Sequence, residues 1–235
     1  MALHSGVFKY NLKIILGLIL FSLISFKLDY VIYGSHSSQK WWFQLFPWMK
    51  LIKHKIILNG VKQNHVRKKK KSFINISFIG RLEIENDPHL FLDICSSNKE
   101  KKNLRFNIFG DGSLAEIIER KHNVKLWGWT KKKRIYANTD IAIITSPLNN
   151  FPYVALESNS YGIPVVTAAE GDIRKIVKNN INGYILKDRT VESFNFYINK
   201  SINNYKYLAS NSIINSKKFD IKKSCKKIWK FFELE

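Results

Sequence analysis

From residue 73 onward, short apolar runs alternate with stretches of helical character, and this alternation constrains the fold more than any other feature of the sequence. The expected strands are residues 74–79, 104–109, 124–127, 141–145, 164–167 and 184–186. Helices are expected from residue 88, over 114–121, around 135–136, and over 153–161 and 173–178. Such alternation indicates βαβ units with right-handed crossovers and a parallel sheet. The sequence therefore predicts an α/β domain that binds ligands at the carboxyl ends of its strands.

Two of these strands are followed by glycines and polar residues. Gly80 and Arg81 follow the first strand, where the planar guanidinium of an arginine can bind phosphate. An ion pair with Glu83 or Glu85 explains this arginine equally well. After the second strand, glycines in the segment 110–112 let the backbone approach a ligand, although a turn with a helix cap is the simpler interpretation.

The fourth strand is followed by residues 146–157 (SPLNNFPYVALE), where a helix is expected to begin at Pro152. Proline suits the first position of a helix. The free amides of Tyr153 and Val154 would form an anion site suited to a diphosphate. Glu157, just over one turn further, is placed to accept hydrogen bonds from a ribose diol, although the helix dipole also favours a carboxylate there.

The first 61 residues do not have the pattern of a complete domain. The apolar run 14–26 would form a helix of roughly 20 Å, short of the ~30 Å of a bilayer core, so a buried or interfacial helix is expected. Strands at 29–35 and 55–61, the second with an Asn59-Gly60 turn, are too few for an independent sheet. The aromatic stretch 40–50 suits a membrane interface or a neighbouring domain.

The chain carries 39 Lys and Arg against 18 Asp and Glu, a formal net charge of +21, which favours an anionic partner. Nucleic acid, a phospholipid surface and a phosphate-bearing small molecule all fit this charge. No zinc, helix-turn-helix or RNA-binding signature occurs, so nucleic acid is not expected as a partner. Cys95 and Cys225 lack metal-ligand spacing and suit a reducing cytoplasm, and no metal site is expected.

Seven short motifs together resemble the C-terminal domain of family 4 glycosyltransferases, which are retaining enzymes of the GT-B fold. They are residues 79–82 (IGRL), 109–112 (FGDG), 124–128 (VKLWG), 136–140 (YANTD), 150–157 (NFPYVALE), 162–166 (GIPVV) and 182–183 (NG). The resemblance implies a Rossmann-like nucleotide-sugar-binding domain over 73–218 and a C-terminal crossover helix over 219–235. Residues 1–61 would be the remnant of an N-terminal, acceptor-side domain, joined by a basic linker over 62–72.

The resemblance also assigns roles to individual residues. Arg81 would bind the donor diphosphate, Glu157 would hold the ribose, and the base would lie at Gly128 and Trp129. The implied catalytic residues are Asn149 and Glu157. The implied nucleotide-sugar-binding residues are Gly80, Arg81, Asn86, Gly110, Asp111, Gly112, Gly128, Trp129, Phe151, Pro152, Tyr153, Val154 and Glu157.

Two of these positions depart from the family pattern. Asn149 stands where the family has a glutamate that touches the donor sugar, and Asn86 stands where it has a lysine that pairs with the arginine. An asparagine still forms hydrogen bonds but carries no charge. Loss of the lysine removes a phosphate contact of about 1.5–3 kcal/mol, for which the nearby lysines 131–133 are candidates to compensate.

The function expected from the resemblance is sugar transfer from a nucleotide-diphosphate sugar to a glycan or lipid-linked acceptor in cell-surface polysaccharide synthesis, with retained configuration. No cofactor is expected, and no DxD-type metal motif occurs in the matching region. The alternative is a non-catalytic nucleotide-sugar-binding module, or one half of a two-chain transferase with a separate N-terminal-domain partner. We expect a cytoplasmic protein, held peripherally on the inner face of the cell membrane by its basic charge and apolar N-terminal segment.

Overall fold

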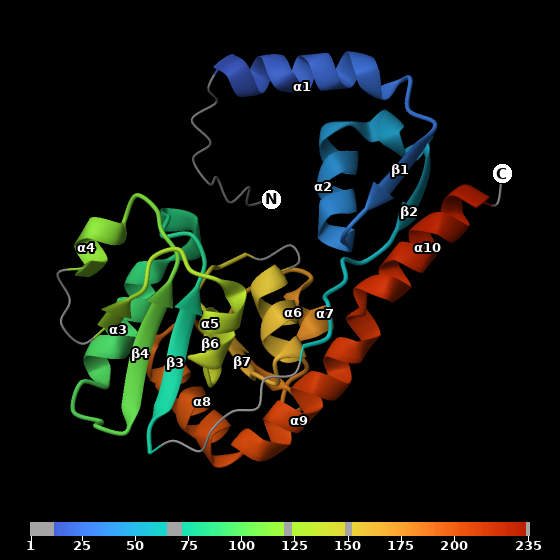
Figure 1. Ribbon diagram of the computed structural model, residues 1–235. Helices are drawn as coiled ribbons and strands as arrows, with labels where there is room; N and C mark the ends of the chain where they lie inside the picture. The colour runs from blue at the N-terminus through green and yellow to red at the C-terminus, as the bar shows by residue number, and fades with distance from the viewer. Residues whose placement is uncertain (1–11, 65–71, 120–123, 149–151, 234–235) are drawn as a thin grey trace. The chain divides into compact units, whose positions relative to one another are not determined.

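The computed structural model describes residues 12–64, 72–119, 124–148 and 152–233 (Figure 1). The chain divides into two compact units, Met1–Leu58 and Asn59–Glu235. The division lies three residues before the domain boundary expected at residue 61.

The larger unit alternates strands and helices over most of its length. Its strands are β3 (Ile74–Ile79), β4 (Leu104–Phe109), β5 (Val124–Leu126), β6 (Ile141–Ile144), β7 (Val165–Thr167) and β8 (Gly183–Ile185). Its helices are η2 (Ile84–Asn86), α3 (Pro88–Ser97), α4 (Ala115–Glu119), α5 (Lys132–Ala137), α6 (Tyr153–Ser160), α7 (Ile173–Ile176), α8 (Val191–Asn203), α9 (Tyr205–Ser216), η3 (Lys217–Phe219) and α10 (Ile221–Glu233).

The six strands form one parallel sheet in the order β5-β4-β3-β6-β7-β8. The chain builds the sheet outward from β3 to β5 and then crosses back to β6 on the other side of β3. This is the doubly wound arrangement, in which the connections diverge between the two central strands and leave a crevice at their carboxyl ends. The prediction of an α/β fold with a parallel sheet is confirmed.

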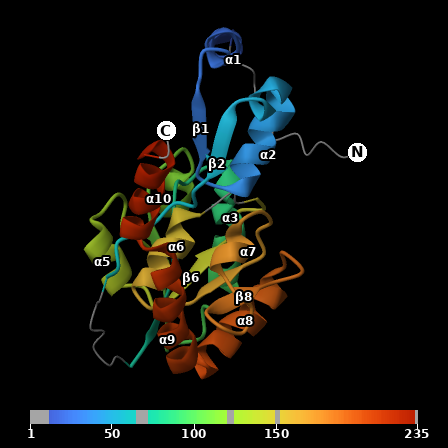
Figure 2. The ribbon, with the colours of Figure 1, turned by 90° about the vertical axis from the view of Figure 1, so that its right-hand side faces the viewer.

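The core lies between the sheet and its helices. Ile76 and Phe78 of β3 pack in one cluster with Phe91 and Ile94 of α3 and Phe194 of α8, all fully or nearly fully buried. Away from this cluster, α6 packs against β6, β7 and α9 (Figure 2). Large apolar residues at 74, 76, 78 and 79 of β3 and at 104, 106, 108 and 109 of β4 made both strands recognisable from the sequence, although polar residues lie between them.

A buried carboxylate aligns the starts of the two central strands. Asp140, directly before β6, accepts hydrogen bonds from the backbone nitrogen and side-chain amide of Asn75 at 2.9 and 3.1 Å. These bonds link β3 to β6 at their amino ends and fix the register in which Ile76 pairs with Ile141. Because the two strands are paired in this register, their carboxyl ends lie next to each other where the crevice opens.

The described part of the smaller unit, residues 12–58, contains five elements around an aromatic cluster. They are α1 (Leu12–Ser25), β1 (Tyr30–Tyr33), α2 (His36–Leu45), η1 (Pro47–Lys50) and β2 (Lys53–Ile56). Strands β1 and β2 pair in parallel, so the expectation that these segments form no sheet of their own is wrong. Tyr33, Phe46 and Met49 supply the buried apolar area that stabilises this small sheet.

The apolar run at 14–26 is helical, but the helix is not buried as a whole. Phe21 of α1 packs 4.8 Å from the ring of Trp42, whereas Leu16, Leu20 and Leu23 are at least half exposed. Among the described residues, no helix is both long and apolar enough to span a bilayer. The helix therefore keeps an exposed apolar side in this structure.

The second expected strand of the N-terminal segment is displaced. It was expected at 55–61, but the strand is β2, Lys53–Ile56. Its pairing with β1 begins with Tyr30 opposite Lys53 and ends at Ile56. The expected Asn59-Gly60 turn is wrong as well. Gly60 lies in an extended segment against α10, where a Cβ would come within 2.5 Å of the Cα of Ile221.

Candidate functional site

The carboxyl ends of β3 and β6 border a hollow of about 410 Å³ at the point where the sheet connections diverge. Gly80 and Arg81 line it, as predicted from their place after β3, and so does Asn86, which the family resemblance implied. Thr145 and Ser146, which follow β6, and the start of α6 also line it. Doubly wound sheets bind their ligands in this crevice.

A second hollow of about 290 Å³ adjoins the first and shares Gly80, Arg81 and Val154 with it. It extends over the ends of β4 and β5 toward α5. Its further lining residues are Ile79, Phe109, Gly110, Asp111, Trp129, Thr130, Lys132, Ile135, Tyr136 and Glu157. The two hollows together bring most of the predicted binding residues to one edge of the sheet.

Gly110 allows the loops after β3 and β4 to touch. Its φ is +142°, and a Cβ at this position would lie 1.8 Å from the carbonyl oxygen of Gly80. The backbone nitrogen of Gly110 donates to the carbonyl oxygen of Gly128 at 3.0 Å. Gly112 and Gly128 do not line either hollow, so these two predicted residues support the loops rather than face the space between them.

Arg81 and Asn86 are both engaged in local contacts. The guanidinium of Arg81 forms an ion pair of 2.8 Å with Glu85, and both side chains are more than half exposed. An exposed pair of this kind contributes about 0–1 kcal/mol, so a phosphate can replace the carboxylate at little cost. The side-chain amide of Asn86 donates to the carbonyl oxygen of Arg81 at 2.9 Å. Asn86 thereby fixes the loop that carries Arg81.

Glu157 is the most extensively bonded side chain of the site. One carboxylate oxygen accepts a hydrogen bond from the hydroxyl of Tyr136 at 2.7 Å, and the other forms an ion pair with Lys132. Tyr136 is 1% exposed and stacks on Tyr161 with ring centroids 4.5 Å apart. Burial, and then the neighbouring Glu157 carboxylate, raises the pKa of Tyr136 well above 10.0, so it remains a hydrogen-bond donor at neutral pH.

The start of α6 differs slightly from the prediction. Pro152 is the N-cap residue, with ψ 113°, rather than the first helical residue. The first bond within the helix runs from the backbone nitrogen of Leu156 to the carbonyl oxygen of Pro152, so the amides of Tyr153 and Val154 precede it, as at any helix start. Pro152, Tyr153 and Val154 all line the first hollow. Asn149 and Phe151 lie outside the described residues.

The sequence analysis named Lys132 only as one of three lysines, 131–133, that are candidates to compensate for the missing cation, and it assigned no role to Tyr136. Lys132 and Tyr136 lie four residues apart on α5, the short helix expected after the third strand, and hence on one face of it. That spacing, directly after a strand end, was the available signal. Trp129 was assigned, and it lines the second hollow with 89% of its surface exposed. No group of three or more potential metal-binding His, Cys, Asp or Glu side chains occurs within the described ranges.

Residues 61–219 match the family described as Glycosyl transferases group 1. An uncharacterised 41.2 kDa protein of the Klebsiella pneumoniae cps region is 28% identical over 129 residues, which are 53% of this chain and 35% of that protein. A UDP-Gal:alpha-D-GlcNAc-diphosphoundecaprenol alpha-1,3-galactosyltransferase of Escherichia coli is 25% identical over 146 residues, 57% of this chain and 38% of the enzyme. The matches therefore span little more than a third of these relatives.

The fold is shared with a solved structure of Anabaena HepE in complex with UDP-glucose. The TM-score is 0.78 at 21% sequence identity, over 94% of this chain and 68% of that one. The likeness establishes the GT-B type of fold. Because the family match covers more than half of the sequence, this chain belongs to the group 1 glycosyltransferases.

Proposed function

We propose that this chain transfers a sugar from a UDP-sugar to a glycan or lipid-linked acceptor in cell-surface polysaccharide synthesis, with retention of configuration. The observation that carries the proposal is the pair of hollows at the end of β3 and β6, lined by Arg81, Glu157 and the start of α6. UDP as the carrier is supported by the galactosyltransferase and the UDP-glucose complex among the similar proteins. Retention is supported by the sequence resemblance.

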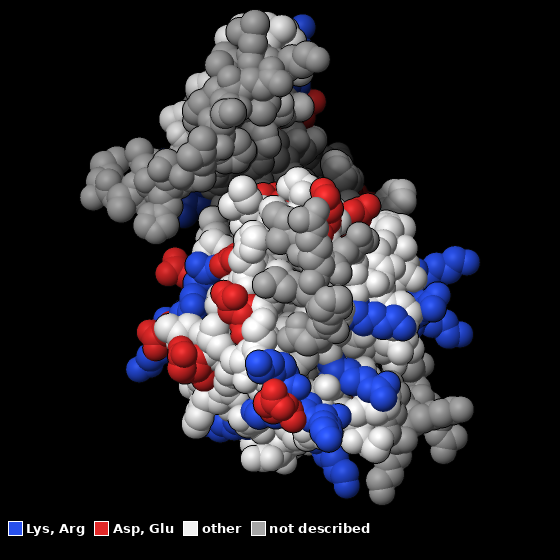
Figure 3. All heavy atoms as spheres, turned by 90° about the vertical axis from the view of Figure 1, so that its left-hand side faces the viewer, with Lys and Arg blue, Asp and Glu red and all other residues white. Residues whose placement is uncertain are grey.

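The proposed chemistry depends on charge and position. Arg81 and the amides of Tyr153 and Val154 would stabilise the diphosphate as it leaves, and Glu157 would orient the ribose. The role of Asn149 as a contact to the donor sugar stays a prediction from the sequence. The net charge of +21 is compatible with this anionic substrate. On the face of the larger unit that carries α3 and α4, basic side chains are scattered with acidic ones among them (Figure 3).

The direct test is calorimetric binding of UDP, GDP and ADP to the full chain. We expect UDP to bind, and Arg81→Ala or Glu157→Ala to weaken binding about tenfold or more, about 1.4 kcal/mol. Glu85→Ala is the matched control, because it removes the partner of Arg81 and leaves the cation. Unchanged UDP affinity in both site variants would contradict the proposed site. A chain that binds UDP but transfers no sugar from a UDP-sugar to any acceptor would favour a non-catalytic module.

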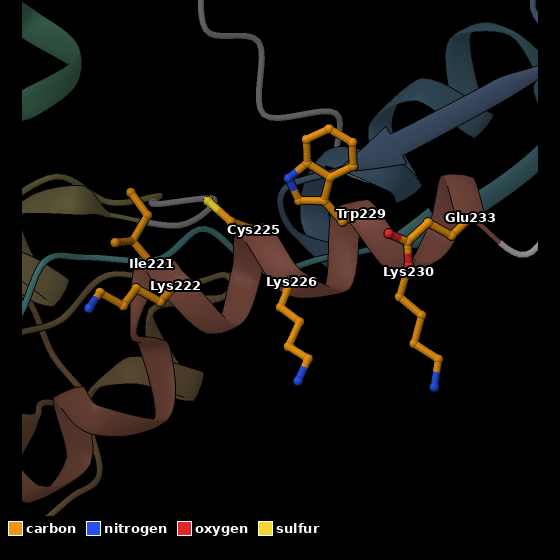
Figure 4. Close-up of a pocket in the computed structure, with 7 residues that line it drawn as sticks. All are labelled: Ile221, Lys222, Cys225, Lys226, Trp229, Lys230 and Glu233. Carbon is orange, nitrogen blue, oxygen red and sulfur yellow. The ribbon is translucent and has the colours of Figure 1, made fainter.

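We also propose that the protein binds membranes peripherally. Exposed leucines of α1 support this, as does α10, on which Ile221, Cys225 and Trp229 project to one side and Lys226 and Lys230 to another (Figure 4). A basic amphipathic helix combines apolar burial with attraction to anionic lipid.

Sedimentation with anionic vesicles tests the membrane proposal. Leu20→Glu combined with Leu23→Glu should reduce binding at high salt, where apolar contacts remain and charge attraction is screened. Leu51→Glu, at a residue 89% exposed outside the helices, is the control. Equal binding by all of these variants would refute a role of α1.

A further inference from the structure

The position that the family resemblance assigns to a second phosphate-binding cation is occupied by Asn86, which cannot supply a charge. Its side-chain amide donates to the carbonyl oxygen of Arg81, and its backbone oxygen accepts from the hydroxyl of Thr145 at 2.8 Å. Both contacts hold the loop after β3 in place. The diphosphate of a nucleotide sugar would therefore meet Arg81 alone on this side of the crevice.

Lys132 brings a second cation to the hollow that Arg81 also lines. Among the described residues that line the two hollows, Arg81 and Lys132 are the basic ones, and both line the second hollow. Lys132 reaches the hollow from α5, and its ammonium group pairs with the carboxylate of Glu157. That pairing positions a positive charge beside the residue proposed to hold the ribose.

The two partners of Glu157 differ in their freedom to move. Tyr136 is buried and stacked, so its hydrogen bond to Glu157 is fixed by packing. The side chain of Lys132 is 71% exposed, and a lysine carries its charge on a flexible stem. Lys132 can turn toward a bound phosphate while Glu157 keeps its bond to Tyr136, which leaves the other carboxylate oxygen for the ribose.

We propose that Lys132 is a specificity-determining residue that binds the diphosphate of the donor and takes the place of the cation absent at Asn86. The inference rests on the proposed nucleotide-sugar function and names the group that recognises the phosphates. A charge of +1 in a partly closed hollow acts mainly on the phosphates and much less on the neutral nucleoside.

The experiment compares UDP with uridine, which has the same base and ribose but no phosphate. Calorimetry is performed on the full chain and on Lys132→Met, with Lys133→Met as the matched control. Lys133 is an exposed neighbour on α5 that lines neither hollow. We expect Lys132→Met to weaken UDP binding roughly tenfold and to change uridine binding little. Lys133→Met should leave the affinity for both ligands close to that of the wild type.

Lys132→Arg tests whether charge is the cause, and we expect it to restore most of the affinity for UDP. The inference is overturned if Lys132→Met leaves UDP binding unchanged, if it weakens UDP and uridine equally, or if Lys132→Arg binds UDP as weakly as Lys132→Met. Equal loss would mean that Lys132 acts through Glu157 on the ribose. A wild-type chain that binds no nucleoside diphosphate would instead refute the proposed function itself, before any variant is compared.

Discussion

Replacing Tyr136 with phenylalanine tests how the site holds its central carboxylate. The substitution keeps the ring that stacks on Tyr161 and removes the hydroxyl that donates to Glu157 at 2.7 Å. Nothing larger enters the buried position, so the change isolates one hydrogen bond to a charged group.

The magnitude follows from the burial of both partners. The Tyr136 residue is 1% exposed and the Glu157 side chain is 15% exposed. A hydrogen bond to a charged group contributes about 1.5–3 kcal/mol. Glu157 keeps its ion pair with Lys132 and borders a hollow, so we expect a loss of about 2 kcal/mol in the free energy of unfolding. For a chain of this size that corresponds to roughly 4–8 °C in Tm.

Urea denaturation measures the stability, and calorimetry with UDP measures the function of Tyr136→Phe. Affinity should fall together with stability, because the carboxylate loses the bond that orients it. Tyr161→Phe is the matched control: it removes a hydroxyl from the other ring of the same stack, and the structure shows no hydrogen bond from that hydroxyl to a described residue. We expect the control to lie within about 0.5 kcal/mol of the wild type. If both variants have the same stability and the same UDP affinity, Tyr136 does not position Glu157.

Three further predictions follow from individual positions. Gly110→Ala should lower the free energy of unfolding, measured in urea, by about 1–3 kcal/mol, because the new Cβ would collide with the carbonyl oxygen of Gly80. Gly17→Ala is the control and should not lower the stability, because no atom lies within 4 Å of its Cβ. Equal stability of the two variants would contradict the close approach at Gly110. In the native protein iodoacetamide should modify Cys225, which is exposed, and not Cys95, because burial raises the pKa of the Cys95 thiol. Mass spectrometry should therefore show one modified thiol per chain, and rapid modification of both would contradict this prediction. Burial raises the pKa of Tyr136 and Tyr205 above 10.0, so above that pH the unfolded chain loses phenol protons that the folded protein keeps. The free energy of unfolding should therefore fall as the pH rises above 10.0. A urea midpoint that does not fall over this range would refute the prediction.

Strands β3 and β4 were predictable because large apolar residues recur along both of them. Residues 74–79 and 104–109 were placed correctly at both ends, whereas strands β5 to β8 are shorter than expected or shifted by one residue. Helix α9 was not assigned. Its buried side includes Ser212, Asn215 and Ser216, so the apolar periodicity that identifies a helix is interrupted where the helix packs.

The site was predictable to the extent that topology determines it. Residues that directly follow parallel strands must meet at one edge of the sheet, and Arg81 and the start of α6 do so. The contacts of Glu157 were not predictable in the same way. They join it to Lys132 and Tyr136, which precede it by 25 and 21 residues, and depend on how two short helices pack. Sequence spacing alone carries no record of that packing.

The start of the larger unit is hydrogen-bonded to the junction between η3 and α10, and this has a consequence for engineering. The backbone nitrogen of Val61 donates to Phe219 at 2.7 Å, and that of Ile221 donates to Val61 at 3.1 Å. Gln63 and Ser216 add a reciprocal pair of hydrogen bonds beside them. These bonds join the two ends of the chain segment that contains strands β3 to β8. A circular permutant of residues 61–221 that joins these two points and opens the chain in the exposed turn at 99–102 would keep strands β3 to β8 in place.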